Sequence, residues 1–159
     1  MERFWIRRKI EFADTDMAGI VHFSRFFVFM ESCELQYLDS LGFGLMTARV
    51  DPAGPRIGWP RVAAACEYLL PVRFGDEIDV GLVVARKGTK SLTFRHEIRH
   101  GAATVARGET SAVCCAIRDG VLQAIPIPPA LAALIQVAPA PAGPAERTPA
   151  KPAELAESR

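Results

Sequence analysis

One long helical pattern near the N-terminus constrains the fold more than any other feature of this sequence. Over residues 24–41, apolar side chains recur at the spacing of one helix face, which predicts a helix of about five turns. Ser24 is a candidate N-cap and Gly42 a candidate C-terminal stop. The apolar positions of this face are Phe26, Met30, Cys33, Tyr37 and Leu41. A helix with such a face must pack against a sheet or against other helices.

Strand-like segments flank this helix on both sides. Apolar residues alternate with polar ones over residues 4–12, which predicts a strand with one buried face. After the helix, four segments separated by short glycine-containing turns have the composition of strands. They span residues 60–70, 77–86, 90–99 and 104–117, and a final short strand is predicted at 121–124. Residues 43–59 contain several glycines and prolines, which predicts a loop with at most one helical turn.

The segment 104–117 carries one face of small side chains, which allows a helix to approach the sheet closely. Its members are Ala106, Gly108, Thr110, Ala112, Cys114 and Ala116. The order of elements predicts an α+β fold in which an antiparallel sheet wraps around one long helix. A chain of 159 residues suits one domain, which we assign to residues 1–137. Proline and alanine supply 12 of the 22 residues in 138–159, which predicts a disordered tail.

Charge and cysteine content exclude several classes of function. The formal net charge is only +1, so composition gives no sign of a nucleic-acid-binding protein. The four cysteines form no C-x-x-C pair and show no zinc-type spacing with the three histidines. We therefore expect free thiols in a reducing cytoplasm, and no metal site. The N-terminus has no signal-peptide core, and prolines interrupt the longest uncharged stretch, so no membrane association is expected.

The stretch FADTDMAGIVHF, residues 12–23, combines groups that suit attack on a carbonyl. A carboxylate such as Asp16 becomes a useful base or nucleophile when it is held against an electrophile in a partly dry site. The backbone N–H groups of Phe23 and Ser24 lie where the predicted helix begins and can take up developing negative charge. Gly19 lets the backbone fold back so that the two parts converge. The alternative is that the acidic pair serves only turn formation and capping.

The longer stretch IEFADTDMAGIVHFSRF resembles the signature of the 4-hydroxybenzoyl-CoA thioesterase-type hotdog family, E-F-x-D-x-D-x-x-G-[IV]-V-x-[YHF]-x-x-[YF]. The matching positions are Glu11, Phe12, Asp14, Asp16, Gly19, Ile20, Val21 and Phe26. A second stretch, TKSLTFRHEI, is similar to the family pattern K-S-F-x-x-R-H. The resemblance extends over most of residues 1–134 and implies a hotdog fold, a five- or six-stranded antiparallel sheet wrapped around one long helix.

The resemblance also implies an active site that needs no metal and no cofactor. Such a site lies between two protomers of a homodimer or homotetramer. The match places the catalytic carboxylate on Asp16, as nucleophile or as base for water, and the carbonyl-polarising N–H on the backbone of Phe23. Phe23 stands where tyrosine or histidine is common in the family. A side-chain contribution there would fall to the neighbouring His22, which either takes part in catalysis or has only a structural or lining role.

Four residues are candidates for binding the substrate: Gly19, Lys87, Lys90 and Trp59. Lys90 matches a position that resembles the family's coenzyme A contacts, and Lys87 lies in the same KGTK turn, where both could meet phosphate. A solvated charged hairpin explains these lysines almost as well. Trp59 either walls an acyl pocket or simply begins a strand.

Two further polar residues lie inside predicted elements. Glu31, in the middle of the helix, either lines the site or forms an ion pair with a neighbouring strand, and the structural role is favoured. His96 shares a strand face with apolar residues, which is more typical of a hydrogen-bonded core histidine than of a catalyst.

Together these observations predict a cytoplasmic enzyme that hydrolyses a short-chain, medium-chain or aromatic acyl-CoA to the free acid and CoA. A thioesterase for acyl-carrier-protein substrates is an alternative, because the pantetheine arm is common to both substrates. A non-catalytic module that binds acyl thioesters is a second alternative, although such a module gains nothing from a carboxylate beside the thioester. A hotdog dehydratase is disfavoured because the sequence has no H-x-x-x-G-x-x-x-x-P stretch.

Overall fold

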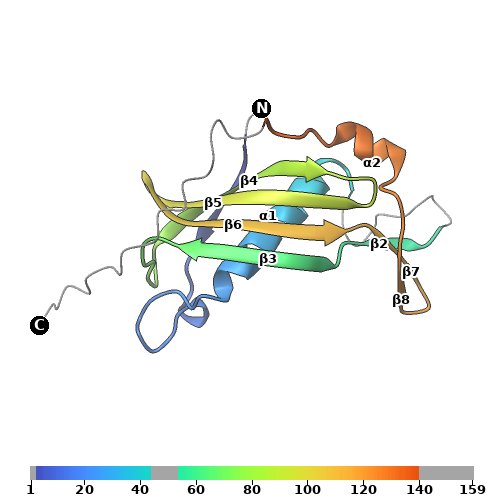
Figure 1. Ribbon diagram of the computed structural model, residues 1–159. Helices are drawn as coiled ribbons and strands as arrows, with labels where there is room; N and C mark the ends of the chain where they lie inside the picture. The colour runs from blue at the N-terminus through green and yellow to red at the C-terminus, as the bar shows by residue number, and fades with distance from the viewer. Residues whose placement is uncertain (1–2, 44–53, 140–159) are drawn as a thin grey trace, which may run out of the picture.

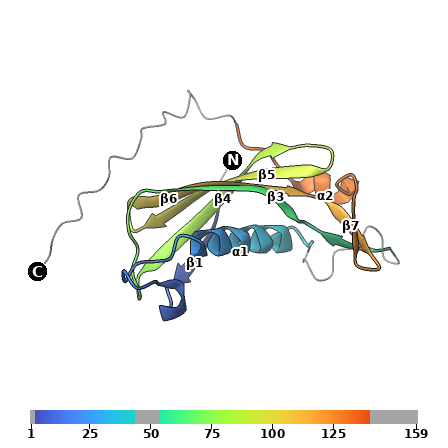
Figure 2. The same cartoon turned by 60° about the horizontal axis from the view of Figure 1, so that its bottom comes forward.

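An antiparallel sheet wrapped on one long helix forms the body of the molecule in the computed structural model, which describes residues 3–43 and 54–139 (Figures 1 and 2). The five-stranded sheet has the strand order β1-β4-β5-β6-β3. Its strands are β1 (Phe4–Lys9), β3 (Arg61–Tyr68), β4 (Glu77–Lys87), β5 (Ser91–His100) and β6 (Ala103–Val113). Helix α1 (Arg25–Ser40) lies across one face of this sheet, as Figure 2 shows. The predicted α+β architecture is confirmed.

Helix α1 begins and ends close to its predicted bounds. Ser24 occupies the N-cap position, but its backbone is helical and its side chain makes no cap hydrogen bond. Its hydroxyl instead pairs with His22 Nδ1 at 2.8 Å, so Ser24 is the N-cap residue as predicted, but its side chain does not cap the helix. The predicted stop at Gly42 is confirmed, because this residue has a φ of +81° and donates its N–H to the Asp39 carbonyl at 2.8 Å.

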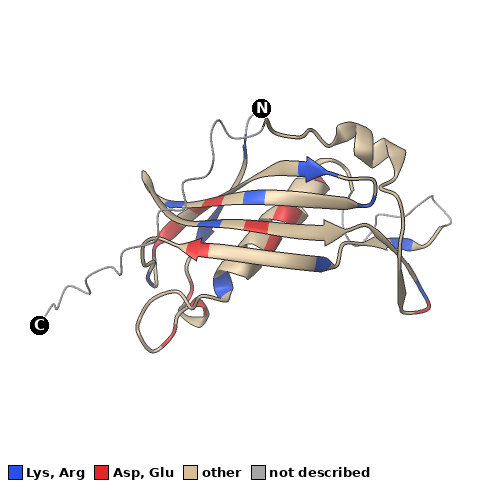
Figure 3. Ribbon diagram, viewed as in Figure 1, with Lys and Arg blue, Asp and Glu red and all other residues tan. Residues whose placement is uncertain are grey.

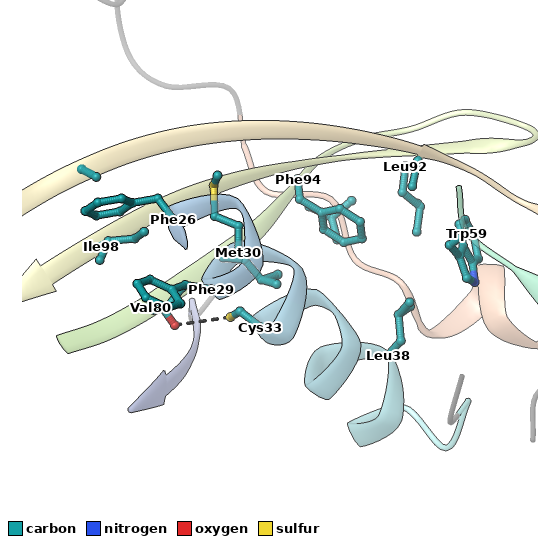
Figure 4. Packing of buried hydrophobic residues seen from close by; sticks show 14 of the residues in the cluster. Phe26, Phe29, Met30, Cys33, Leu38, Trp59, Val80, Leu92, Phe94 and Ile98 are labelled. Carbon is teal, nitrogen blue, oxygen red and sulfur yellow. Dashed lines mark hydrogen bonds between the residues drawn. The ribbon is translucent and has the colours of Figure 1, made fainter. Parts of the chain in front are cut away.

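The helix packs on the sheet mainly over β4, and its Met30 side chain also reaches the small face of β6. A Cβ atom added to Gly108 would lie 2.3 Å from Met30 Sδ, so a larger residue there would force the Met30 side chain to move. Ala106 and Ala112 are fully buried on the same strand. Figure 4 shows how α1 directs its apolar side chains toward those of the sheet. The largest fully buried apolar side chains include Phe29, Met30, Leu82, Leu92, Phe94 and Ile98.

The predicted strand at 104–117 is in fact two strands in different sheets. Strand β6 ends at Val113, which pairs with the first residue of β5. The chain then enters a three-stranded sheet of order β2-β7-β8, formed by β2 (Arg56–Gly58), β7 (Cys115–Arg118) and β8 (Val121–Ala124). At the junction, the Cys114 N–H donates to the Lys90 carbonyl, and the Cys114 carbonyl accepts the Ile125 N–H. The prediction of a single strand was wrong because the alternation of side chains continues through Cys114, whereas the pairing with β5 ends at Val113.

Three shorter elements were not predicted. Strand β2 lies in the segment predicted to be a loop, and residues 44–53 of that segment lie outside the described residues. The 3₁₀ turn η1 (Phe12–Asp14) replaces the end of the predicted first strand, because the Asp14 side chain accepts the Glu11 N–H at 3.0 Å and turns the chain. Helix α2 (Pro129–Leu134) begins with a proline, which suits the first turn of a helix.

The last described residues remain attached to the sheet. Val137 forms a parallel bridge with Val84, and the Ala138 N–H donates to the Val84 carbonyl at 2.8 Å. Most of the predicted tail, residues 140–159, lies outside the described residues. In the part of the chain that the structure describes, no helix is long and apolar enough to cross a membrane. The four cysteines are free, as predicted.

Candidate active site

The loop that carries Asp16 is closed on itself. A β-bridge pairs Thr15 with Val21, and the Asp16 N–H donates to the Ile20 carbonyl at 3.0 Å. Gly19 has a φ of +73°, a conformation that favours glycine, and donates its N–H to the Asp16 carbonyl at 2.9 Å. The chain therefore reverses at the residue that the sequence singled out for this purpose.

The Asp16 carboxylate lies at the wall of an apolar pocket of about 410 Å³. Its Oδ1 accepts the Ala18 N–H at 2.8 Å, which is the turn chemistry of the alternative prediction. Its Oδ2 has no hydrogen-bond partner among the described residues, so one oxygen is available to a molecule in the pocket. The other walls are apolar or aromatic, chiefly Ile20, Phe23, Phe26, Tyr68, Leu70 and Val72.

Phe23 contributes to the same pocket from the start of α1. Its side chain is 60% exposed, and within residues 3–43 and 54–139 its backbone N–H has no acceptor. The N–H of the next residue, Ser24, points to His22 Nδ1 at 3.4 Å. The structure thus brings Asp16 and Phe23 together at one pocket, with a free N–H beside the positive end of the helix dipole.

The His22 side chain is held by its neighbours and does not line this pocket. Its Nδ1 pairs with the Ser24 hydroxyl at 2.8 Å, and its ring lies 4.4 Å from the Phe23 ring. The His22 N–H donates to the Asp14 carbonyl at 2.9 Å. These contacts favour the local structural role over the catalytic one.

Asp14 fastens the loop to the rest of the molecule. Its carboxylate is fully buried and accepts hydrogen bonds from Arg25 Nε at 2.8 Å and from the Glu11 N–H at 3.0 Å. Arg8 approaches the same carboxylate at 3.5 Å. Burial alone would raise the pKa of Asp14, but the hydrogen bonds from Glu11 and Arg25 and the charges of both arginines outweigh it and lower that pKa. Asp14 therefore stays ionised and ties the loop to β1 and α1.

A second pocket, of about 320 Å³, lies farther along the gap between α1 and β3. Trp59 and Phe27 line it, and both Glu31 and Arg61 reach it, joined by an ion pair of 3.4 Å. Glu31 therefore both lines a pocket and pairs with a residue of the neighbouring strand. Trp59 is buried at the wall, which agrees with the predicted role in an acyl pocket and also with its place just before β3.

Glu34 is a buried carboxylate that the sequence prediction missed. It is fully inaccessible and accepts hydrogen bonds from Arg61, from the Thr110 hydroxyl and from His96 Nε2, the last at 3.0 Å. Burial would raise the pKa of Glu34, but the His96 hydrogen bond and the Arg61 charge lower it. A charged residue four positions after the buried Met30 on the apolar helix face was the available signal. His96 is a hydrogen-bonded core residue, as predicted.

The two lysines of the KGTK turn lie far from Asp16 within one chain. They stand where β4 ends and β5 begins, at the opposite end of the sheet from the Asp16 loop (Figures 1 and 3). Lys87 Nζ donates to the carbonyls of Ala132 and Ile135 at 2.8 and 2.9 Å, at the C-terminal end of α2. Among the residues that the structure describes, Lys90 Nζ reaches only the Ala124 carbonyl, at 3.4 Å. Lys90 is therefore the less constrained of the two.

No group of His, Cys, Asp and Glu side chains in the described ranges has the arrangement of a metal site. The chemistry available at the pocket is that of a carboxylate and a backbone N–H acting on a polar bond. Attack on a carbonyl carbon fits this pair, because one group supplies the nucleophile or base and the other stabilises the oxyanion.

Comparison with known proteins places this geometry in a family. The model of the "Thioesterase-like superfamily" matches residues 10–135. A 1,4-dihydroxy-2-naphthoyl-CoA hydrolase of Nostoc punctiforme is 27% identical over 111 residues, which cover 70% of this chain and 73% of the relative. A putative esterase of Aquifex aeolicus is 29% identical over 77% of this chain and 91% of the relative.

Solved structures of thioesterases superpose on the chain. A gentisyl-coenzyme A thioesterase matches with a TM-score of 0.70 and 25% identity, covering 80% of this chain and 98% of the other. A 1,4-dihydroxy-2-naphthoyl-CoA thioesterase from Synechocystis matches with a TM-score of 0.68 and 26% identity, covering 84% and 98%. The predicted hotdog fold is confirmed, and the chain belongs to the thioesterase-like superfamily.

Proposed function

We propose that this protein hydrolyses an aromatic acyl-CoA to the free acid and CoA. The observation that carries the proposal is the shared pocket, in which a free oxygen of Asp16 and the free N–H of Phe23 meet apolar walls. The named relatives support the reaction class, because several are hydrolases or thioesterases of aromatic acyl-CoA esters. They are named for 1,4-dihydroxy-2-naphthoyl-CoA and gentisyl-CoA rather than for 4-hydroxybenzoyl-CoA.

In the proposed reaction, the thioester carbonyl oxygen faces the Phe23 N–H. As a nucleophile, Asp16 attacks the carbonyl carbon, the C–S bond breaks with its electron pair on sulfur, and water then cleaves the resulting anhydride. As a base, Asp16 takes a proton from water, whose oxygen attacks the carbonyl carbon, and the C–S bond then breaks with its electron pair on sulfur, which takes up the proton. In both routes the negative charge on the carbonyl oxygen is stabilised by the N–H and by the positive end of α1.

The acyl group would occupy the gap between α1 and β3. The walls near Asp16 include the rings of Phe23, Phe26 and Tyr68, which suit an aromatic ring. The second pocket, with Trp59 at its wall, extends the same gap. Short and medium aliphatic chains are the alternatives for this space.

The complete site would include a second protomer. Strand β3 is an edge of the sheet, and its middle residues, Val62 to Ala65, are exposed and carry no charge. Such an edge is suited to pairing with another strand. A partner bound along β3 would bring a second KGTK turn toward the pocket, with Lys90 free to meet the CoA phosphates. A homodimer is the smallest assembly that satisfies this arrangement, and a homotetramer contains two of them.

We place the protein in the cytoplasm, where free thiols persist. The carrier-protein alternative differs only in the outer surface that meets the substrate. The binding-module alternative leaves the free carboxylate oxygen of Asp16 without a use. The free oxygen of Asp16 thus favours the CoA thioesterase over the binding module.

A panel of thioesters tests the proposal. Wild-type protein is incubated with aromatic, short-chain and medium-chain acyl-CoA esters and with the same acyl groups on a carrier protein, and the released thiol is measured. We expect the highest kcat/KM for an aromatic acyl-CoA. Release only from carrier-protein esters would select the first alternative, and tight binding without any release would select the binding module.

A further inference from the structure

Tyr68, the last residue of β3, connects the edge of the sheet to the start of α1. Its ring packs edge to face on Phe26, with ring centroids 5.2 Å apart, and its side chain lines the pocket that Asp16 and Phe23 share. Its hydroxyl donates to the Phe23 carbonyl at 3.1 Å. The proposal above uses only the ring, as a wall of the acyl pocket, and gives the hydroxyl no role.

The first turn of α1 shows what this hydrogen bond replaces. The N–H of Arg25 bonds to the His22 carbonyl at 2.9 Å and the N–H of Phe27 bonds to the Ser24 carbonyl at 3.2 Å, so this turn is tight. Within the described ranges, no backbone N–H is left for the Phe23 carbonyl. The hydroxyl of the tyrosine supplies the missing donor.

The contact adds to a backbone hydrogen bond between the same two segments, which runs from the Val21 N–H to the Val72 carbonyl at 2.8 Å. The chain after Tyr68 is held to the sheet, because the N–H groups of Leu69 and Leu70 both donate to the Val105 carbonyl, at 2.8 and 3.2 Å. The Phe23 segment belongs to the helix start. A side chain anchored on the sheet thus fixes the peptide plane that follows the Phe23 N–H.

We propose that Tyr68 is a positioning residue for thioester hydrolysis, which orients the Phe23 N–H toward the substrate carbonyl oxygen by holding the Phe23 carbonyl. This inference rests on the proposed function. Tyr68 acts through the backbone and transfers no proton. Burial raises the pKa of its hydroxyl to about 12, so the group remains a donor at any pH suited to the assay.

The test is Tyr68→Phe, which removes the hydroxyl and keeps the ring against Phe26. We expect kcat to fall about three- to tenfold, the effect of losing one neutral hydrogen bond that acts on the transition state. KM stays unchanged because the pocket wall is retained, and the pH profile of kcat keeps its shape because Tyr68 does not titrate. The matched control is Tyr37→Phe, since Tyr37 packs on Phe4 and its hydroxyl has no hydrogen bond among the described residues.

Amide hydrogen exchange of the segment 20–28 provides a readout independent of catalysis. We expect faster exchange there in Tyr68→Phe and no change in Tyr37→Phe. An unchanged kcat, or a raised KM with unchanged kcat, overturns the positioning role even if exchange is faster. A wild-type protein that hydrolyses no thioester in the panel defeats the proposed function itself, and the inference with it.

Discussion

Two aspartates two positions apart have different surroundings in this chain. Asp14 is buried against Arg25 and Arg8, whereas Asp16 is exposed at a pocket. The residues that bury Asp14 lie 11 and 6 positions away in the sequence, so local patterns could not reveal them. The sequence predicted that Asp16 and the helix start would lie together, and both line one pocket, but it did not predict the buried ion pairs of Asp14 that hold the loop.

The ion pairs of buried Asp14 with Arg25 and Arg8 predict that the stability of the fold depends on pH. Asp14→Asn should lower the free energy of unfolding by about 3 kcal/mol at neutral pH, because it leaves Arg25 facing an uncharged amide. Since the pKa of Asp14 is lowered in the folded state, its contribution is present above its unfolded pKa, about 4, and is lost as pH falls through the folded value. The urea midpoint of unfolding should therefore fall more steeply toward acid pH for the wild type than for the variant.

The control for this prediction is Asp79→Asn. Asp79 also pairs with an arginine, Arg7, at 2.8 Å, but the Arg7 side chain is 69% exposed. Solvent screens such a pair, so the control should be much less destabilised. Equal losses of unfolding free energy in the two variants would show that the buried ion pairs of Asp14 do not stabilise the fold more than an exposed pair does.

At the scale of elements, the sequence predicts what periodicity can encode. Helix α1 and strands β3, β4, β5 and β8 lie close to their predicted bounds because each repeats one pattern between clear turn residues. The prediction failed between β6 and β7, where the end of a strand is set by its change of partner strand and not by its side-chain pattern. Helix α2 was not predicted because its six residues are too few to show the 3.6-residue period of a helix face.

The small face of β6 makes a prediction about packing. Gly108→Ala places a methyl group against Met30 Sδ, 2.3 Å from the added Cβ, and should destabilise the protein by about 1–3 kcal/mol. The measurement is the midpoint of denaturant unfolding. Adding Met30→Ala should make the cost of Gly108→Ala smaller than in the wild type, because the clashing atoms are gone. Equal cost in both backgrounds would contradict the contact.

Substitutions of the two lysines of the KGTK turn should have different effects. Lys87→Met removes the donor to the last carbonyls of α2 and should speed hydrogen exchange over residues 129–138, because that helix end loses a favourable cation. Lys90→Met should instead raise KM for the acyl-CoA by about tenfold, the effect of one lost phosphate contact of roughly 1.4 kcal/mol. A larger KM effect from Lys87→Met than from Lys90→Met would reverse this assignment.

At the scale of the whole molecule, one chain presents the parts of the proposed site at opposite ends. The loop before α1, which carries Asp16 and Phe23, lies at one end of the sheet, and the turn between β4 and β5, which carries Lys90, lies at the other (Figure 1). No pattern within the sequence predicts that a second copy must bring them together. That expectation came only from the family resemblance, and the exposed, uncharged edge of β3 supports it.

The assembly can be tested at that edge. Wild-type protein should have twice the 17.3 kDa chain mass, or four times in a tetramer, by light scattering. Ala63→Lys places a charge on the exposed edge strand and should give a monomer with reduced thioesterase activity. The control is Ala102→Lys, in the exposed turn between β5 and β6. A wild-type protein that is monomeric and fully active would refute the shared site.

The most direct test of the account is CoA release from the best aromatic acyl-CoA by Asp16→Asn, compared with wild type. We expect kcat to fall at least about a hundredfold with an unchanged fold, because the substitution removes the nucleophile or base and keeps the shape. Asp39→Asn, at the other end of α1, is the matched control and should retain full activity. An Asp16→Asn protein with near wild-type kcat would contradict the central claim that this carboxylate performs the chemistry.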